Sequence, residues 1–275
     1  MKMVLRVSKN VLTILSLLLL FTVSVLASDK KGIGLADLKG AERVKILNVK
    51  WYYTWGPYPI EGINEEEIEF VPMIWGGKRL EEHLEAIRKK GFVKVLLYLN
   101  EPDKEDQANM SVEEALYYLP EVRKYTERLG SPACAGGIKP WCQRFLEEAK
   151  KMNIEIDFIA VHIYGPPDPE KFLKRIDEIY QKYKKPIWIT EFAVADWEAK
   201  KEGRENRYSE KEVLEFMKKV LPELEKRPYV ERYAWFGAGK NCQKLPQIKP
   251  SCLFNEDGSL TELGKFYSRF KWNSD

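Results

Sequence analysis

Histidine is the scarcest chemically versatile residue of this 275-residue chain, which has only two, His83 and His162. Catalytic zinc sites usually take several ligands from histidine, so two isolated histidines leave such a site without a ligand set. The four cysteines include no Cys-x-x-Cys pair, which disfavours structural zinc. No Gly-x-Gly-x-x-Gly follows the first predicted strand, so the dinucleotide-binding signature is absent too. We therefore expect neither a metal nor a cofactor.

The sequence also has few long apolar runs: there is one, Val11 to Ala27. The basic residues Lys2, Arg6 and Lys9 precede it, and small residues end it, which is typical of a secretory signal peptide cleaved after Ala27. We thus divide the chain into a leader, 1–27, and a domain, 28–275, and expect a secreted protein. The run is about 17 residues long, so an uncleaved membrane anchor is the alternative. After cleavage we expect no membrane association.

The domain also lacks an excess of either charge. The whole chain has 45 Lys and Arg against 42 Asp and Glu, but three of the basic residues and none of the acidic ones lie in 1–27. Residues 28–275 therefore carry no formal net charge, and no chain-wide positive field favours nucleic acid as a partner.

Export makes the four cysteines interpretable as disulfides. Cys134 lies near Cys142 in the sequence, and Cys242 lies near Cys252. Three pairings are possible, and the spacing favours these two local bridges. A zinc site formed by all four is the alternative.

Short apolar stretches that are typical of buried parallel strands alternate with amphipathic helical stretches. Such an alternation predicts a single-domain α/β fold, the (β/α)8 barrel, with an open doubly wound sheet as the alternative. Eight strands are predicted, at Gly32–Asp37, Ile46–Trp55, Ile68–Trp75, Val93–Asn100, Arg128–Ala133, Ile156–Tyr164, Pro186–Phe192 and Val230–Phe236.

Helix starts are marked by three capping boxes and one Asp-Pro pair. The boxes are Ser111 with Glu114, Ser209 with Glu212, and Ser259 with Glu262, and the pair is Asp168-Pro169.

Two glutamates each end an apolar strand. Glu101 follows the fourth strand within Asn100-Glu101-Pro102, and Glu191 follows the seventh. In a barrel, the carboxyl ends of the strands surround one active site, so the two carboxyl groups are expected to converge there. A retaining glycosidase needs such a pair about 5–5.5 Å apart. Ordinary surface glutamates are the alternative.

Seven segments along the domain carry a resemblance to a known family. They are Trp51-Tyr52-Tyr53-Thr54-Trp55-Gly56, Phe70-Val71-Pro72-Met73-Ile74-Trp75-Gly76, Asn100-Glu101-Pro102-Asp103, Gln107-Ala108-Asn109-Met110, Val161-His162-Ile163-Tyr164, Trp188-Ile189-Thr190-Glu191-Phe192 and Tyr233-Ala234-Trp235-Phe236. In this order they resemble glycoside hydrolase family 128, the β-1,3-glucanases with a glycosyl hydrolase catalytic core. This resemblance implies that Glu101 is the acid/base, that Glu191 is the nucleophile, and that the substrate is a β-1,3-glucan.

Aromatic and polar residues at strand ends are candidates for sugar binding, because rings stack on sugars and polar groups take their hydroxyls. Trp51, Trp188 and Tyr53 are expected in the barrel core, His83 is expected to be structural, and His162 fits a core or a site role equally. The predicted substrate-binding set is Trp55, Trp75, Asn100, Gln107, Asn109, His162, Tyr164 and Trp235.

The sequence therefore predicts a secreted, monomeric, retaining endo-β-1,3-glucanase. Two alternatives stay open. One is a glycosidase for another β-glycan, because specificity resides in barrel loops. The other is a carbohydrate-binding barrel without catalysis.

Overall fold

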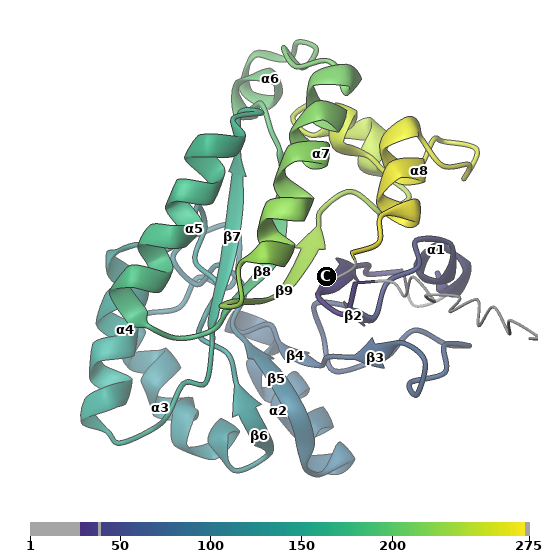
Figure 1. Cartoon of the computed structure of the whole chain (residues 1–275). Coiled ribbons are helices and arrows are strands. Elements are labelled where there is room, and N and C mark those ends of the chain that lie inside the picture. Colours follow the sequence, from purple (N-terminus) through teal and green to yellow (C-terminus); the bar gives the residue numbers. More distant parts are fainter. Residues whose placement is uncertain (1–27, 38–39, 273–275) are drawn as a thin grey trace, which may run out of the picture.

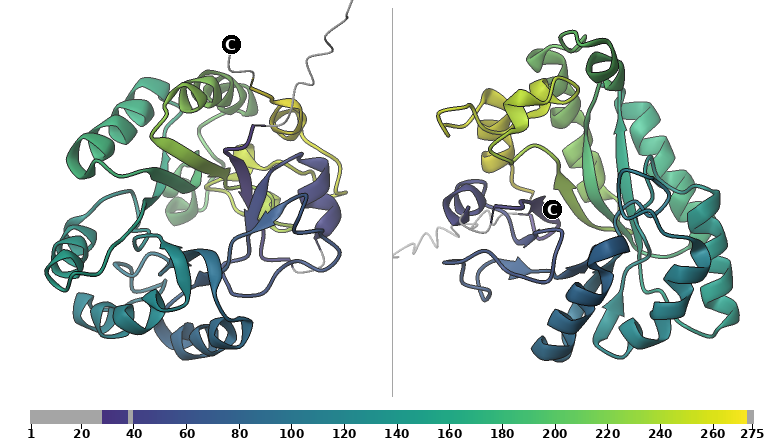
Figure 2. Two further views of the ribbon diagram at one scale, coloured as in Figure 1. Left: turned by 60° about the horizontal axis from the view of Figure 1, so that its bottom comes forward. Right: turned by 180° about the vertical axis from the view of Figure 1, so that it is seen from behind.

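The structure, a computed structural model, describes residues 28–37 and 40–272. Parallel strands alternate with helices along the chain (Figure 1), and the helices form an outer ring around the strands (Figure 2, left). The predicted α/β barrel is confirmed. The predicted leader, 1–27, lies outside the described residues. Within the described part of the chain, no helix combines the length and the apolar character needed to cross a bilayer.

All eight predicted strands form, but the third is split at Val71-Pro72. Proline has no N–H to donate to a neighbouring strand, so the pairing partner changes there from the second strand to the fourth. The strands are β1 Lys31–Gly34, β2 Trp51–Tyr53, β3 Glu69–Phe70, β4 Met73–Ile74, β5 Val93–Tyr98, β6 Thr126–Leu129, β7 Ile159–Gly165, β8 Ile187–Val194 and β9 Val230–Trp235.

The strands follow one another around a ring. The hydrogen-bonded order is β3-β2-β1-β9-β8-β7 in one sheet and β4-β5-β6 in the other, and every pair is parallel. The continuous chain from β3 to β4 joins the sheets on one side. On the other side, a parallel bridge between Gly130 and Phe158 links the end of β6 to the start of β7.

The alternation of strand and helix fails at one predicted unit. The chain between β2 and β3 forms turns and no helix in the described structure. The predicted strand Ile46–Trp55 was too long, because Ile46 ends a helix and pairing starts at Trp51. The helices are α1 Ala41–Ile46, α2 Leu80–Lys90, α3 Val112–Arg123, α4 Pro140–Lys151, α5 Pro169–Tyr183, α6 Trp197–Glu202, α7 Glu210–Lys226 and α8 Glu262–Arg269, with 3-10 turns η1 Gly77–Arg79, η2 Cys242–Lys244 and η3 Lys249–Ser251.

Side chains alternate between the barrel interior and the layer under the helices. The interior cluster holds large rings, and the predicted core residues Trp51, Tyr53 and Trp188 are all in it, each at most 1% exposed. On β9, the small Ala234 points inward while Trp235 lies in the helix-facing cluster. This alternation decides which residues at the strand ends can reach the barrel mouth.

The predicted local disulfides both form, Cys134–Cys142 and Cys242–Cys252, so the zinc alternative is wrong. Each bridge constrains a loop that follows a strand, β6 in one case and β9 in the other.

The predicted helix starts hold with one exception. Ser111 and Ser209 form complete capping boxes, and Asp168 caps α5 with Pro169 in its first turn. The prediction at Ser259 is wrong, because Thr261 is the N-cap of α8 and accepts from the Gly264 N–H.

The cap of α8 gives a stability test. Thr261→Ala removes the acceptor for the Gly264 N–H and the donor to the Cys252 carbonyl, which should cost about 1 kcal/mol. For a domain of this size, the thermal midpoint should fall by about 2–4 °C. Ser259→Ala is the matched control and should change the stability by less than about 0.5 kcal/mol. An equal or larger loss in Ser259→Ala would contradict this assignment of the cap.

Candidate active site

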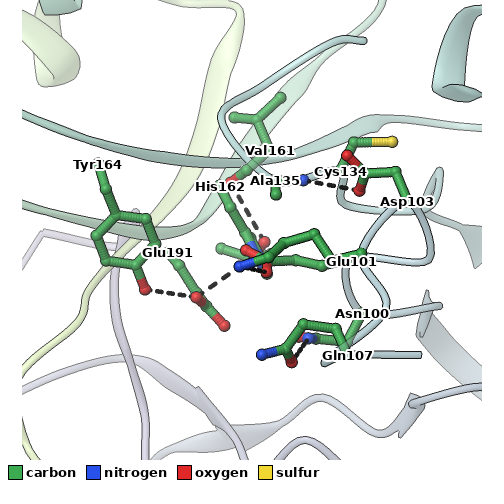
Figure 3. A network of polar contacts seen from close by, with 12 residues as sticks. Asn100, Glu101, Asp103, Gln107, Cys134, Ala135, Val161, His162, Tyr164 and Glu191 are labelled. Atoms are coloured by element: carbon green, nitrogen blue, oxygen red, sulfur yellow. Dashed lines mark hydrogen bonds and ion pairs between the residues drawn. The ribbon is translucent and has the colours of Figure 1, made fainter. Parts of the chain in front are cut away.

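The barrel mouth holds two buried carboxyl groups. Glu191 lies within β8, and Glu101 lies three residues beyond β5; their exposed fractions are 6% and 7%. Glu101 has a left-handed backbone (φ 43°), which is costly for a residue other than glycine. A hydrogen bond of 2.8 Å from its N–H to the Ala133 carbonyl holds this conformation. The side chain of Glu101 lies beside those of His162 and Glu191 (Figure 3), which come from β7 and β8.

The imidazole of His162 stands between the two glutamates. Its Nδ1 lies 3.0 Å from Oε1 of Glu101 and 3.4 Å from Oε2 of Glu191. One carboxylate oxygen from each glutamate and one ring nitrogen lie within 4.8 Å of one another. The other ring nitrogen, Nε2, is buried and has no hydrogen-bond partner in the described structure. Nδ1 therefore makes the polar contacts of the ring, and it makes them to both carboxylates.

Glu191 is surrounded by neutral donors from neighbouring strands. The Tyr164 hydroxyl donates to Oε2 at 2.5 Å, and the indole N–H of Trp55 donates to Oε1 at 2.7 Å. The Tyr53 hydroxyl lies 3.3 Å from Oε1 and also reaches the Thr190 carbonyl. Donors in this number stabilise negative charge on the carboxylate.

Space for two of these rings depends on a glycine in β1. A Cβ atom on Gly34 would lie 2.7 Å from the ring of Trp55 and 2.9 Å from that of Tyr53. A larger residue there would displace both donors to Glu191.

The charges of the site are coupled. Burial by itself would lower the pKa of His162, but Glu191 and Glu101 outweigh burial and raise it. Burial would raise the pKa of Glu101, but the hydrogen bond and charge of His162 and the charge of Lys104, whose Nζ is 3.7 Å away, lower it. Burial and the charge of Glu191 raise the pKa of Tyr53 and Tyr164 well above the usual value, so both remain donors. The opposite shifts of Glu101 and His162 favour a protonated imidazole paired with an ionised Glu101.

A cavity of about 720 Å³ opens over the glutamates. Trp55, Trp75, Asn100, Gln107 and Tyr164, which belong to the predicted substrate-binding set, line it. Nδ2 of Asn100 donates to Oε1 of Gln107 at 3.1 Å, while Oδ1 of Asn100 is buried without a partner in the described structure. That oxygen is available to accept a hydrogen bond from a ligand in the cavity.

Two further hollows adjoin this cavity. One neighbouring hollow, of about 410 Å³, shares Trp55 and Phe236 with it. Another, of about 710 Å³, shares Trp75 and Gln107. Because the two shared sets of residues differ, the hollows adjoin different parts of the cavity that the glutamates line.

Three predicted binding residues do not line the cavity: Trp235, Asn109 and His162, the last of which is buried against the two glutamates. Trp235 is 0% exposed, packs on Phe192, and donates its indole N–H to the Ser251 carbonyl. It is a core residue because it points toward the helices and not into the barrel mouth. Asn109 is exposed and lines only the neighbouring hollow beyond Gln107.

Other cavity residues were missed from the sequence. Phe236 lines the cavity in the place predicted for Trp235, one residue further along the chain. The alternation of side chains along β9 is the signal that could have found it, given that Ala234 points inward. Trp197 comes from α6, and its ring packs edge-on against that of Tyr164. Lys104 pairs with Glu101. Neither position is marked by strand patterns.

The only metal-competent cluster found among the described residues is Glu101, His162 and Glu191. The same Nδ1 that would bind an ion is the atom that bridges the carboxylates. A metal there would have to displace the proton that the raised pKa favours on His162, so proton transfer is the chemistry this arrangement fits better.

The other histidine has a structural role, as predicted. His83 is buried on α2, and its Nδ1 accepts from the N–H of Trp75 at 3.1 Å. This contact fixes the backbone of a residue that lines the cavity.

Comparison with known proteins places the site in a family. Residues 34–267 match the family described as "Glycosyl hydrolase catalytic core". The chain is 31% identical to a family 128 (subgroup I) endo-β-1,3-glucanase from Amycolatopsis mediterranei, solved with laminaripentaose. The TM-score is 0.75, and the match covers 88% of this chain and 99% of that one.

Two further relatives differ in length and described role. A family 128 (subgroup III) curdlan-specific exo-β-1,3-glucanase from Blastomyces gilchristii, solved with glucose, is 32% identical, with a TM-score of 0.66 and coverage of 88% of this chain and 98% of that one. Alkali-sensitive linkage protein 1 of Schizosaccharomyces pombe is 29% identical over 258 residues, which is 87% of this chain and 44% of that protein. The chain thus spans less than half of this curated relative.

The two histidines provide a direct test of the electrostatics. Burial lowers the pKa of His83 from its ordinary 6.5, while the two glutamates raise that of His162 above it. A nitrogen-15 NMR titration should show two separate imidazole transitions on opposite sides of pH 6.5, with His83→Asn removing the lower one. Two coincident transitions, or a lower pKa for His162, would contradict the protonated imidazole.

Proposed function

The chain belongs to the glycosyl hydrolase catalytic core family and, within it, to glycoside hydrolase family 128, and from this we propose that it is a secreted, retaining endo-β-1,3-glucanase. The observation that carries the proposal is the buried pair Glu101 and Glu191, with carboxylate oxygens within 4.8 Å of each other. This separation suits a nucleophile that attacks the sugar directly, because an inverting enzyme must leave room for a water molecule.

In the first step, Glu191 is the nucleophile. Its carboxylate attacks the anomeric carbon while the glycosidic oxygen leaves with a proton from Glu101, which forms a glycosyl ester and frees one end of the glucan. Three donors, Tyr164, Trp55 and Tyr53, stabilise the charge of Glu191 before the attack. They also hold the carboxylate in one orientation.

In the second step, Glu101 acts as the base. It takes a proton from water, whose oxygen attacks the anomeric carbon and releases Glu191. Two displacements restore the original configuration, and Glu101 ends the cycle with its proton.

The proton for the first step comes from the coupled pair. Nδ1 of His162 and Oε1 of Glu101 lie 3.0 Å apart, and the raised pKa of His162 and the lowered pKa of Glu101 favour the proton on the imidazole before substrate binds. Transfer to Glu101 as the glucan excludes water from the cavity makes the acid available, so the relevant pKa belongs to the pair and not to one residue.

Endo cleavage is supported by the two neighbouring hollows. Because they adjoin different parts of the cavity, they leave room for glucan before and after the cleaved bond. The β-1,3 linkage is supported by the relatives solved with laminari-oligosaccharides. Oδ1 of Asn100 is the candidate acceptor for a sugar hydroxyl beside the anomeric carbon.

The remaining proposals concern location and assembly. Two disulfides suit an oxidising compartment, and a leader over 1–27 would direct the chain there. We propose a monomer with β-glucan as its partner.

Laminarin hydrolysis tests the function. The chain should release oligosaccharides of mixed length whose new reducing ends are first formed in the β configuration, as followed by proton NMR together with chromatography. Release of the α anomer would contradict retention. Activity on another purified β-glycan and none on laminarin would overturn the linkage.

Variants of the two glutamates separate their roles. Glu101→Ala should slow laminarin hydrolysis by about 10²–10⁴-fold. With azide and a dinitrophenyl β-laminarioside, it should give a β-glycosyl azide, because azide then replaces the deprotonated water. Glu191→Ala should give the α-glycosyl azide, because azide replaces the nucleophile. Glu66→Gln, on an exposed loop, is the control and should keep full activity; exchanged azide products would reverse the roles.

His162 should set the basic limb of the pH–rate profile. In His162→Asn, the proton is held by a carboxyl group alone, which starts from a lower pKa than an imidazole. The pKa of the basic limb of kcat/KM should therefore move to lower pH, together with a loss of kcat. His83→Asn is the matched control and should leave the limb in place. An unmoved limb in His162→Asn would show that His162 does not share the proton.

A further inference from the structure

A second buried carboxylate lies at the opposite end of the barrel from the catalytic pair. Glu225, near the end of α7, is 8% exposed. It accepts hydrogen bonds from the hydroxyls of Ser28 and Tyr233, the latter at 2.6 Å. Among the residues that the structure describes, no lysine, arginine or histidine forms a direct ion pair with it, although the charges of Lys30 and Lys31 attract it from further away. Burying a carboxylate without a cation in contact is costly, so this site has room for a closer partner of the opposite charge.

The two nearest lysines are committed to other groups. Lys30 donates to the carbonyls of Glu225 and Arg227 at the end of α7. Lys31 donates to the carbonyls of Tyr267 and Phe270 at the end of α8. Both therefore satisfy helix C-termini, and neither ammonium forms an ion pair with the Glu225 carboxylate.

The segment 28–31 is built into the base of the barrel. The Lys30 carbonyl accepts from the Trp51 indole and from the backbone N–H of Tyr233, at 2.9 Å each. Figure 1 shows this N-terminal part beside the C-terminal chain, in agreement with the contacts of Lys31 to α8. Ser28 is the first described residue of the segment and is itself buried.

We propose that the amino terminus created by cleavage between Ala27 and Ser28 is the counter-ion of Glu225. Hydrolysis of that peptide bond consumes one water and leaves a carboxylate on Ala27 and an ammonium on Ser28. The new ammonium lies within about 4 Å of the Ser28 hydroxyl, because only three covalent bonds separate them. That hydroxyl already binds Glu225.

This arrangement makes removal of the leader part of folding. Ser28 is buried in the folded domain, so the bond before it is cut while the chain is still unfolded, during export. If the leader stays attached, the nitrogen of Ser28 is an uncharged amide and Glu225 has no cation in contact. The inference depends on export processing and not on the glucanase activity.

The test compares the exported full-length chain with one that carries Gly-Gly between Ala27 and Ser28. Sequencing of the secreted chains should read Ser28 first in the parent, and two glycines before Ser28 in the insertion. At pH 7, the insertion should lower the thermal midpoint by about 2–4 °C. Equal midpoints, or a secreted parent that retains its leader, would overturn the proposal.

The pH dependence of the stability difference between the two chains shows whether the added group is an ammonium. Pairing with Glu225 raises the pKa of the ammonium, so its stabilisation is complete below the unfolded value of about 7.7–8.0 and is lost as pH rises through the folded value. The other groups facing the pair are Lys30, Lys31, Tyr233 and Tyr267. Burial lowers the pKa of Lys31 to about 7, against the charge of Glu225, which raises it. All four groups are present in both chains, so the difference between the chains reports the ammonium together with its effect on the charge of Lys31.

Combining Glu225→Gln with the insertion completes a double-mutant cycle. In this background the insertion should no longer lower the midpoint, because no carboxylate remains for the ammonium. An equal loss in the Glu225→Gln background would mean that the extension disturbs packing alone, and it would overturn the proposal. The kcat on laminarin at 25 °C should be the same for the parent and the insertion, since the site lies at the other end of the barrel. The stability result is therefore independent of whether laminarin is the substrate.

Discussion

Two carboxylates held out of water within 4.8 Å of each other are the constraint on which the rest of the barrel mouth depends. Two like charges brought this close out of water need a neighbouring positive charge. The imidazole of His162 lies against both groups, so a single proton relieves the repulsion wherever it resides. The three neutral donors to Glu191 stabilise its negative charge in preference to that of Glu101. This difference makes Glu191 the nucleophile and leaves Glu101 as the acid.

The backbone supports this asymmetry. Glu101 adopts a left-handed conformation that its strand would not favour, and a hydrogen bond to Ala133 holds it. Trp55 is left-handed as well, and Gly34 leaves room for its ring. Strain and close packing are thus concentrated where the side chains must meet, which is common at active sites.

The base of the barrel also holds a buried carboxylate, but the groups around it differ from those at the mouth. Glu225 has two hydroxyl donors and no ion-pair partner among the described residues, while Lys30 and Lys31 satisfy the ends of two helices. At the mouth, a buried charge serves chemistry and is balanced by a mobile proton. At the base, a buried charge serves structure, and a fixed amino terminus suits it better, because nothing there needs to change charge.

The sequence by itself determined the features that depend on neighbouring residues. Apolar runs located all eight strands, the close spacing of the cysteines indicated both disulfides, and local Ser-x-x-Glu patterns located two capping boxes. Glu101 and Glu191 could be predicted because each comes at the end of a recognisable apolar run.

Only the tertiary structure decided which side chains reach the site. Trp235 points to the helices and Phe236 to the cavity, and the choice depends on how β9 pairs with β8, where the register shifts between Ile189 and Phe192. Tyr53 lies more than 130 residues before Glu191 in the sequence and contacts it because both side chains face the inside of the ring of strands. Closure of the ring fixes the inward faces of all strands at once, and no local pattern contains that information.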